Sequence, residues 1–168
     1  MVETYIRISG IQPERNICKG VVLMDTQAAL MTIVYDQLVG DSQLATIMGT
    51  VNVHPLSSPA DTPVPYIVQE LTLRETDKPF PLNEGTLTLH LWDTGSNVTR
   101  ILNMRSCVIA LFNQLMYTDD DVSGARFNLQ MDSFVTDEPG IYHYVILFDI
   151  RLYKASEAKA ILEREDSM

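Results

Sequence analysis

Hydrophobic residues recur along this chain with two different spacings, and each change of spacing marks a new element. Two segments carry the 3.6-residue period of a helix packed on one side, at residues 25–40 and 96–117. The first begins at Asp25 as its N-cap, and a short helical turn at residues 44–48 follows it. The second begins at Ser96 and is the longest predicted helix, roughly 30 Å at the helical rise per residue.

Other segments alternate between apolar and polar residues, which is the two-residue period of a strand. They lie at residues 66–73, 86–92, 127–135 and 141–153, and a further short strand is expected between residues 51 and 65. This order predicts an α+β fold, with a mostly antiparallel β-sheet and two main α-helices packed on one face. The last strand would span roughly 43 Å. We therefore expect part of it to extend past the domain's own core and to pair across subunits.

The two ends of the chain differ in pattern from this domain. We assign the folded domain to residues 25–154, an N-terminal extension to residues 1–24, and a short charged helix or tail to residues 155–168. In the extension, residues 2–8 alternate with strand periodicity. The alternating sets are Val2, Thr4, Ile6 and Ile8 against Glu3, Tyr5 and Arg7. Such a strand is expected to add to the edge of a sheet, in this subunit or in a neighbour.

Composition narrows the classes of function. The chain has 168 residues and a net charge of −10, with 12 basic residues that are scattered along it. Sequence-independent binding of nucleic acid needs clustered Lys and Arg, so it is not expected. An acidic wall nevertheless suits a conduit through which nucleic acid passes without binding. The sequence has no apolar run of membrane-spanning length and no signal-peptide pattern, so we expect no membrane partner and a reducing cytosol until assembly.

The sequence offers little chemistry, so we predict no enzyme, no cofactor and no metal. His54, His90 and His143 each stand alone, and surface imidazoles are favoured over metal ligands. Three consecutive aspartates at 119–121 lack the alternate spacing of an EF-hand loop, which favours a solvated acidic loop over a cation site. Cys107 falls in the pattern of the second long helix and is expected to be a small buried thiol, not a disulfide partner.

Two aromatic residues are candidates for contact with other subunits. Trp92 ends a strand on the face opposite its leucines, and both core packing against a second layer and an interface anchor fit that position. Phe80 lies among charges in the long loop at residues 74–85, where little intramolecular core is within reach. An interface role is favoured for Phe80.

Several short segments recur in a characteristic order along residues 25–153. In chain order they read AAL at 28–30, LVGD at 38–41, PYIV at 65–68, LTLHLWD at 87–93 and HYVILFDIRLY at 143–153. A proline-rich stretch precedes the third segment, and a polar-capped helix follows the fourth. This layout resembles the tail-completion and tail-terminator proteins of long-tailed bacteriophages.

The resemblance implies a structural virion protein of the tail or neck, assembled in the host bacterial cytoplasm. Such proteins form a ring, usually a hexamer, that caps the last ring of tail tube protein and docks a head-completion or neck connector protein, while DNA transits the lumen. A head-to-tail connector is the alternative within this class. A small phage hydrolase or nuclease and a cytosolic small-molecule adaptor are the other classes. The residues expected at subunit or ring contacts are Arg74, Asp77, Lys78, Phe80, Glu84, Trp92, Asp119, Asp120, Asp121, Asp149 and Arg151.

Overall fold

The computed structural model describes residues 19–76, 83–95, 98–118, 124–135 and 139–153 of the chain. The elements in chain order are α1 (Lys19–Gly40), α2 (Ser42–Met48), β1 (Val53–Pro55), β2 (Tyr66–Glu75), β3 (Asn83–Thr94), α3 (Thr99–Phe112), β4 (Met116–Tyr117), β5 (Ala125–Val135) and β6 (Ile141–Leu152). The predicted N-terminal strand at residues 2–8 and the predicted C-terminal helix at residues 155–168 lie outside the described residues.

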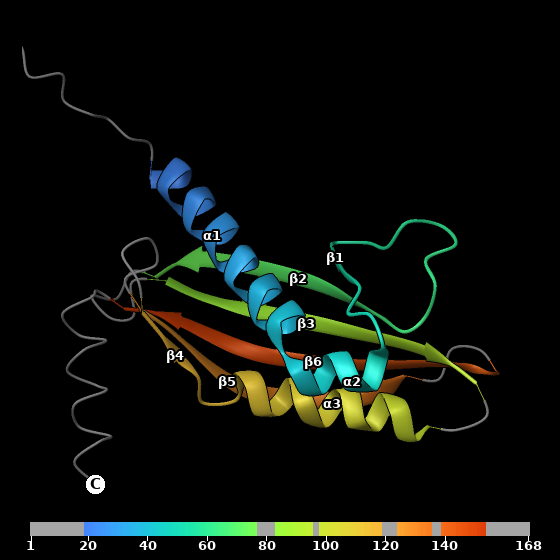
Figure 1. Cartoon of the computed structure of the whole chain (residues 1–168). Coiled ribbons are helices and arrows are strands. Elements are labelled where there is room, and N and C mark those ends of the chain that lie inside the picture. The colour runs from blue at the N-terminus through green and yellow to red at the C-terminus, as the bar shows by residue number, and fades with distance from the viewer. Residues whose placement is uncertain (1–18, 77–82, 96–97, 119–123, 136–138, 154–168) are drawn as a thin grey trace, which may run out of the picture.

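The strands form one sheet with the order β1-β2-β3-β6-β5-β4. The short edge strand β1 runs parallel to β2, and every other neighbouring pair is antiparallel. The helices α1, α2 and α3 all lie on one side of this sheet (Figure 1). The predicted α+β fold, with two main helices on one face of a mostly antiparallel sheet, is confirmed. None of the helices in the described part of the chain is long and apolar enough to cross a membrane.

The hydrophobic core fills the space between the helices and the sheet face that they cover. The strands contribute alternate residues to it, and α1 and α3 contribute residues three or four apart, as the two periods require. Fully buried examples are Leu30, Val34, Leu38, Ile67, Leu89, Leu91, Ile101, Met104, Val108, Phe112, Ile146 and Phe148. Phe112 of α3 lies 5.8 Å from both Phe127 and Phe148 between ring centroids, so one helix joins β5 and β6.

Two side-chain hydrogen bonds fix α1 against β2. The amide of Gln27 donates to the carbonyl oxygen of Leu71 at 2.8 Å. The buried amide of Gln69 donates to the carbonyl oxygen of Met31 at 3.3 Å. Because higher residue numbers on the helix match lower numbers on the strand, α1 runs antiparallel to β2.

The second long helix is shorter than its sequence pattern predicts. The pattern extends to about Tyr117, but α3 ends at Phe112, and Asn113 is already extended with φ −66° and ψ 121°. The backbone N–H of Gln114 then donates to the carbonyl oxygen of Phe127 at 2.9 Å. The next residues pair with β5 as the two-residue strand β4. The apolar residues after Phe112 therefore continue the core from a strand and not from a helix. The predicted start of this helix at Ser96 is also wrong, because α3 begins at Thr99 with Val98 as its N-cap and without a side-chain cap hydrogen bond. Ser96 itself lies outside the described residues.

The prediction that the last strand extends past the core and pairs across subunits is wrong. β6 is a central strand that pairs with β3 along its whole length, from Asn83 opposite Leu152 to Thr94 opposite Ile141. On its other side it pairs with β5 from Ala125 onwards. Its hydrogen bonds are thus satisfied within the subunit, because β3 extends well beyond the residues 86–92 that alternation alone marks.

The long loop predicted at residues 74–85 is largely strand. β2 continues to Glu75 and β3 begins at Asn83, so Arg74 and Glu84 lie directly opposite each other in the sheet. Gly85 allows this pairing, because a Cβ atom at that position would collide with the carbonyl oxygen of Thr72 and the side chain of Leu73. Residues 77–82 lie outside the described residues.

Candidate functional site

The face of the sheet opposite the helices is the candidate functional site, and we refer to it as the open face. It carries the alternate residues of β2, β3, β6 and β5 that point away from the core. No described helix or strand covers it. Its two ends differ: the end near the start of β2 carries aromatic rings and histidines, and the end near Glu84 carries charges and hydroxyls.

Stacked rings cross three strands at the first end, and we call them the aromatic cluster: Tyr66, His90, Trp92 and His143, with His54 at its margin. Tyr66 lies 6.2 Å from Trp92 between ring centroids, and the two rings are inclined by 20°. Trp92 lies 3.8 Å from His143 with the rings inclined by only 8°. The strand register places these residues side by side, because Tyr66 is opposite Trp92, and Trp92 is opposite His143.

Two histidines of the aromatic cluster share a hydrogen bond. Nδ1 of His90 lies 2.9 Å from Nε2 of His143. One of these nitrogens must be an unprotonated acceptor, so both imidazoles cannot be cationic while the bond holds. Glu70 lies 3.8 Å from the other ring nitrogen of His90. The prediction that the histidines stand alone at the surface is wrong for this pair, because β3 and β6 bring them together and His143 is only 8% exposed.

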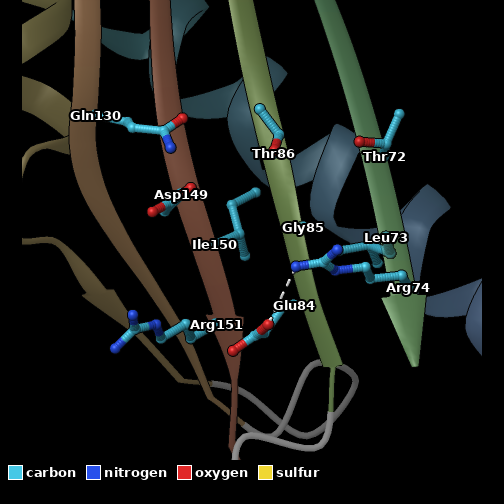
Figure 2. Close-up of a pocket in the computed structure, with 10 residues that line it drawn as sticks. All are labelled: Thr72, Leu73, Arg74, Glu84, Gly85, Thr86, Gln130, Asp149, Ile150 and Arg151. Atoms are coloured by element: carbon cyan, nitrogen blue, oxygen red, sulfur yellow. Dashed lines mark hydrogen bonds and ion pairs between the residues drawn. The ribbon is translucent and has the colours of Figure 1, made fainter. Parts of the chain in front are cut away.

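The other end of the open face is hollowed. The hollow has a volume of about 610 Å³ and is lined by Thr72, Leu73, Arg74, Glu84, Gly85, Thr86, Gln130, Asp149, Ile150 and Arg151. Figure 2 shows these residues across four neighbouring strands, with the helices behind the sheet. Arg74 and Glu84 form an ion pair at 3.4 Å in which the arginine side chain is 78% exposed. We call this region the polar hollow.

The residues predicted at interfaces from the sequence fall into three groups. The structure brings Arg74, Glu84, Asp149 and Arg151 together in the polar hollow. It places Trp92 at the other end of the open face, half-buried in the aromatic cluster. The remaining predicted residues lie outside the described residues: Asp77, Lys78, Phe80, Asp119, Asp120 and Asp121.

Sequence analysis missed several residues of the open face, including Tyr66, Thr72, Thr86 and Gln130. A signal was present for the first three, because each shares the alternation that puts its strand's polar residues opposite the core leucines. Gln130 had no such signal. It lies at an irregularity in the β5–β6 register between Leu129 and Met131, which shifts the alternation within β5.

Two ion pairs on the helical side of the sheet hold α3 in place. Arg100 donates from Nε to Asp93 Oδ2 at 2.8 Å, and Asp93 is only 1% exposed. Arg105 donates to Asp132, which also accepts from the hydroxyl of Tyr144 at 2.8 Å. The hydrogen bond from Arg105 holds the pKa of Asp132 below its usual range, and burial raises the pKa of Tyr144. These groups position a helix and do not line the polar hollow.

Cys107 is half-buried, and its sulfur lies 3.8 Å from Oε1 of Gln43 in α2. Burial raises the pKa of its thiol, which disfavours the nucleophilic thiolate. Among residues 19–153, wherever the structure describes them, no three His, Cys, Asp or Glu side chains gather as metal ligands would. The open face thus presents aromatic rings at one end and charges of both signs at the other.

This protein is therefore an α+β domain with one helix-covered sheet face and one open face. No protein-family model and no curated protein matches this sequence. Among solved structures, a chain titled "Virion of native gene transfer agent (GTA) particle" aligns with a TM-score of 0.59 and 14% identity, over 78% of this chain and 96% of that chain. A second solved chain aligns with a TM-score of 0.55 and 11% identity, over 74% of this chain and 94% of that one.

The gp17 protein of bacteriophage SPP1 aligns less well, with a TM-score of 0.47 and 20% identity, over 75% of this chain and 90% of that chain. At these identities the first two alignments show a shared fold. They span nearly the whole length of both solved chains.

Proposed function

We propose that this protein is a structural virion component of a tailed phage or a related particle. The observation that carries the proposal is the match in fold to almost the entire length of a chain from a gene transfer agent virion. The sequence segments that resemble tail-terminator proteins support the same role independently. In this role the protein forms a ring of six copies that ends the tail tube and joins it to the head or neck connector.

The open face is the surface that we propose for contacts within or between rings. A ring follows from a contact between two different surfaces of the same chain, when the rotation it imposes closes on itself. The aromatic cluster provides the large planar groups that are enriched at the centres of interfaces. The polar hollow provides charges of both signs, in Arg74, Glu84, Asp149 and Arg151, and such charges set orientation more than affinity.

The net charge of −10 fits the passage of DNA through such a ring. Phosphates are repelled by an acidic wall, so DNA would transit the lumen without being retained. Salt would then have little effect on any association of the free protein with DNA, since counterion release requires basic contacts. The proposed role requires no catalytic step.

Tail-tube capping tests the proposal directly. The purified protein would be mixed with preassembled tail tubes and imaged by electron microscopy, and its mass would be measured by light scattering with and without tubes. We expect a ring of added density at one tube end. A strictly monomeric protein that adds to no tube would contradict the proposal.

The same material separates the terminator from the head-to-tail connector. A terminator should copurify with tube protein, whereas a connector should copurify with the portal complex. Capture by the portal complex alone, with bare tube ends, would contradict the terminator role while leaving the virion assignment intact. The control is the same protein after heat unfolding, which should associate with neither.

A further inference from the structure

One long stretch of sheet edge is unpaired in the described part of the chain. β1 covers β2 only at Ile67, Val68 and Gln69, and beyond Gln69 no described strand pairs with β2 on that side. The backbone N–H and C=O groups of the odd-numbered β2 residues point outward at this edge. The N–H of Ile67 donates to Asn52 at 2.8 Å, and the carbonyl of Gln69 accepts from Leu56 at 3.0 Å.

The side chains beside this free edge alternate in a specific way. On the helical side lie Leu71, which is buried, and Leu73, which packs against the core. On the open face lie Glu70, Thr72 and Arg74, so the free edge carries a negative charge at one end and a positive charge at the other. A strand that completes it needs apolar residues on one side and the opposite order of charges on the other.

We propose that residues 2–7 of the same chain form an antiparallel strand on this edge. The register places Glu3 opposite Arg74, Tyr5 opposite Thr72 and Arg7 opposite Glu70. On the other side of the strand, Ile6 lies opposite Leu71 and Thr4 opposite Leu73, beneath the outer side of α1. The proposal concerns the subunit itself and does not depend on the proposed function.

Charge and alternation select this register over its competitors. A parallel strand would place Glu3 near Glu70 and Arg7 near Arg74, which pairs like charges. A slip of one residue would move Ile6 to the open face and Arg7 to the apolar side. A slip of two residues keeps the faces but separates both charged pairs.

Backbone hydrogen bonding agrees with the same register. Because the odd-numbered β2 residues point outward, Ile6 and Leu71 form a hydrogen-bonded pair, and Thr4 and Leu73 form the next one. The charged pairs then occupy the non-hydrogen-bonded positions, where side chains come closest. The carbonyl of Leu71 already accepts from Gln27, and its second lone pair is available to the added strand.

Residues 9–18 are long enough to connect the proposed strand to the start of α1. α1 runs antiparallel to β2 with Gln27 beside Leu71, so its start at Lys19 lies about 12 Å further along, near the level of Glu75. The strand would end near Gln69, about 20 Å from that level at the rise of a strand. Residues 9–18 can span about 33 Å when extended, which exceeds this distance. The chain at β1 and just after it explains why the strand stops there. The backbone N–H of Leu56 already donates to the carbonyl oxygen of Gln69.

The added strand would protect the sheet. An uncovered edge with outward N–H and C=O groups is a template for pairing with other chains. With residues 2–7 in place, free copies cannot associate through β2, and subunit contacts are confined to other surfaces.

A disulfide tests the register. Tyr5→Cys with Thr72→Cys, in a background carrying Cys18→Ser and Cys107→Ser, places two thiols at a non-hydrogen-bonded pair, whose Cα separation suits a disulfide. We expect rapid crosslinking within one chain under mild oxidation, read by non-reducing electrophoresis and peptide mass. The matched control is Thr4→Cys with Thr72→Cys, whose side chains would lie on opposite faces and should crosslink at least tenfold more slowly. Equal rates in the two pairs, or crosslinks that join two chains, would overturn the proposal.

A charge exchange gives a second measurement. Arg7→Glu should slow the Tyr5–Thr72 crosslink about two- to fivefold, since it places two carboxylates opposite each other. Combining it with Glu70→Arg should restore the original rate. Failure of the double exchange to restore that rate would rule out this register.

Discussion

The two faces of the sheet are built from the same strands with the same alternation, yet they differ in what covers them. On the helix-covered face, Leu89, Ile146 and Phe148 are fully buried beneath α1 and α3. On the open face, their immediate neighbours Thr88 and Leu147 remain partly exposed. The alternation fixes which residues share a face, whereas the helices decide which face becomes the core.

The two ends of the open face differ in how their side chains are covered. Near Trp92 the rings of neighbouring strands cover one another, and His143 is buried although no described helix lies over it. Near Glu84 the side chains are polar and the surface is hollowed. Stability should therefore depend chiefly on the covered face and association chiefly on the open face. Four variants test that division.

The largest effect is expected in the core. Phe148→Ala removes a buried ring that packs against Phe112 and leaves a cavity, so the free energy of unfolding should fall by about 3–5 kcal/mol. Denaturant titration measures the change. Thr88→Ala, on the open face of the adjacent strand, is the matched control and should change the same quantity by less than about 1 kcal/mol. Similar losses at both sites would refute the division between the faces.

The next largest effect is expected where α3 joins the sheet. Asp93→Ala removes the acceptor of Arg100 and of the Thr94 N–H, so the free energy of unfolding should fall by about 1.5–3 kcal/mol. Arg100 keeps contact with water, which limits the loss. Asp36→Ala on the exposed side of α1 is the control. A loss of less than about 0.5 kcal/mol at Asp93 would show that the Asp93–Arg100 ion pair does not hold α3 in place.

The third effect depends on pH. The hydrogen bond from Arg105 lowers the pKa of Asp132 in the folded state, so the unfolded chain binds more protons between that pKa and the ordinary value near 3.9. The stabilisation is complete above the ordinary value and is lost as the pH falls through the folded pKa. Asp132→Asn should therefore cost about 1 kcal/mol at pH 7 and much less in acid, measured by urea titration at both pH values. A cost independent of pH would contradict this role for the carboxylate.

The smallest effect on stability is expected at the polar hollow. Arg74→Glu with Arg151→Glu should change the free energy of unfolding by about 0.5 kcal/mol or less, since both side chains are exposed. The same pair should abolish ring formation at tube ends if the open face makes the contacts. Asp36→Lys, an exposed reversal on α1, should leave both properties unchanged. Normal rings from the double variant would exclude the polar hollow from the interface.

Much of the fold was predictable from the two hydrophobic periods. They located α1, β2, β3, β5 and β6, and they assigned the helices to one side of the sheet. The predicted N-cap Asp25 is wrong, because α1 begins at Lys19 and Asp25 lies inside it. The end of α3 was not predictable, because the residues after Phe112 are apolar in either conformation. Their conformation is set by β5, whose backbone accepts Gln114 and pairs with Met116.

The candidate site was predictable in part. Arg74 and Glu84 were candidates as charges in a predicted long loop, and Asp149 and Arg151 as the charged end of the last strand. All four line one hollow. That they meet depends on the pairing of β2 with β3 and of β3 with β6, and no local pattern encodes those registers.

The residues that share a face of each strand or helix could be identified from the order of amino acids alone, since this follows from local backbone geometry and side-chain polarity. Which strands became neighbours depended on the folded arrangement of the whole domain. Residues 90 and 143 are distant in sequence, and their hydrogen bond exists because long-range pairing placed β6 beside β3. Such pairing is selected by packing of the whole core, so it cannot be obtained from any one segment.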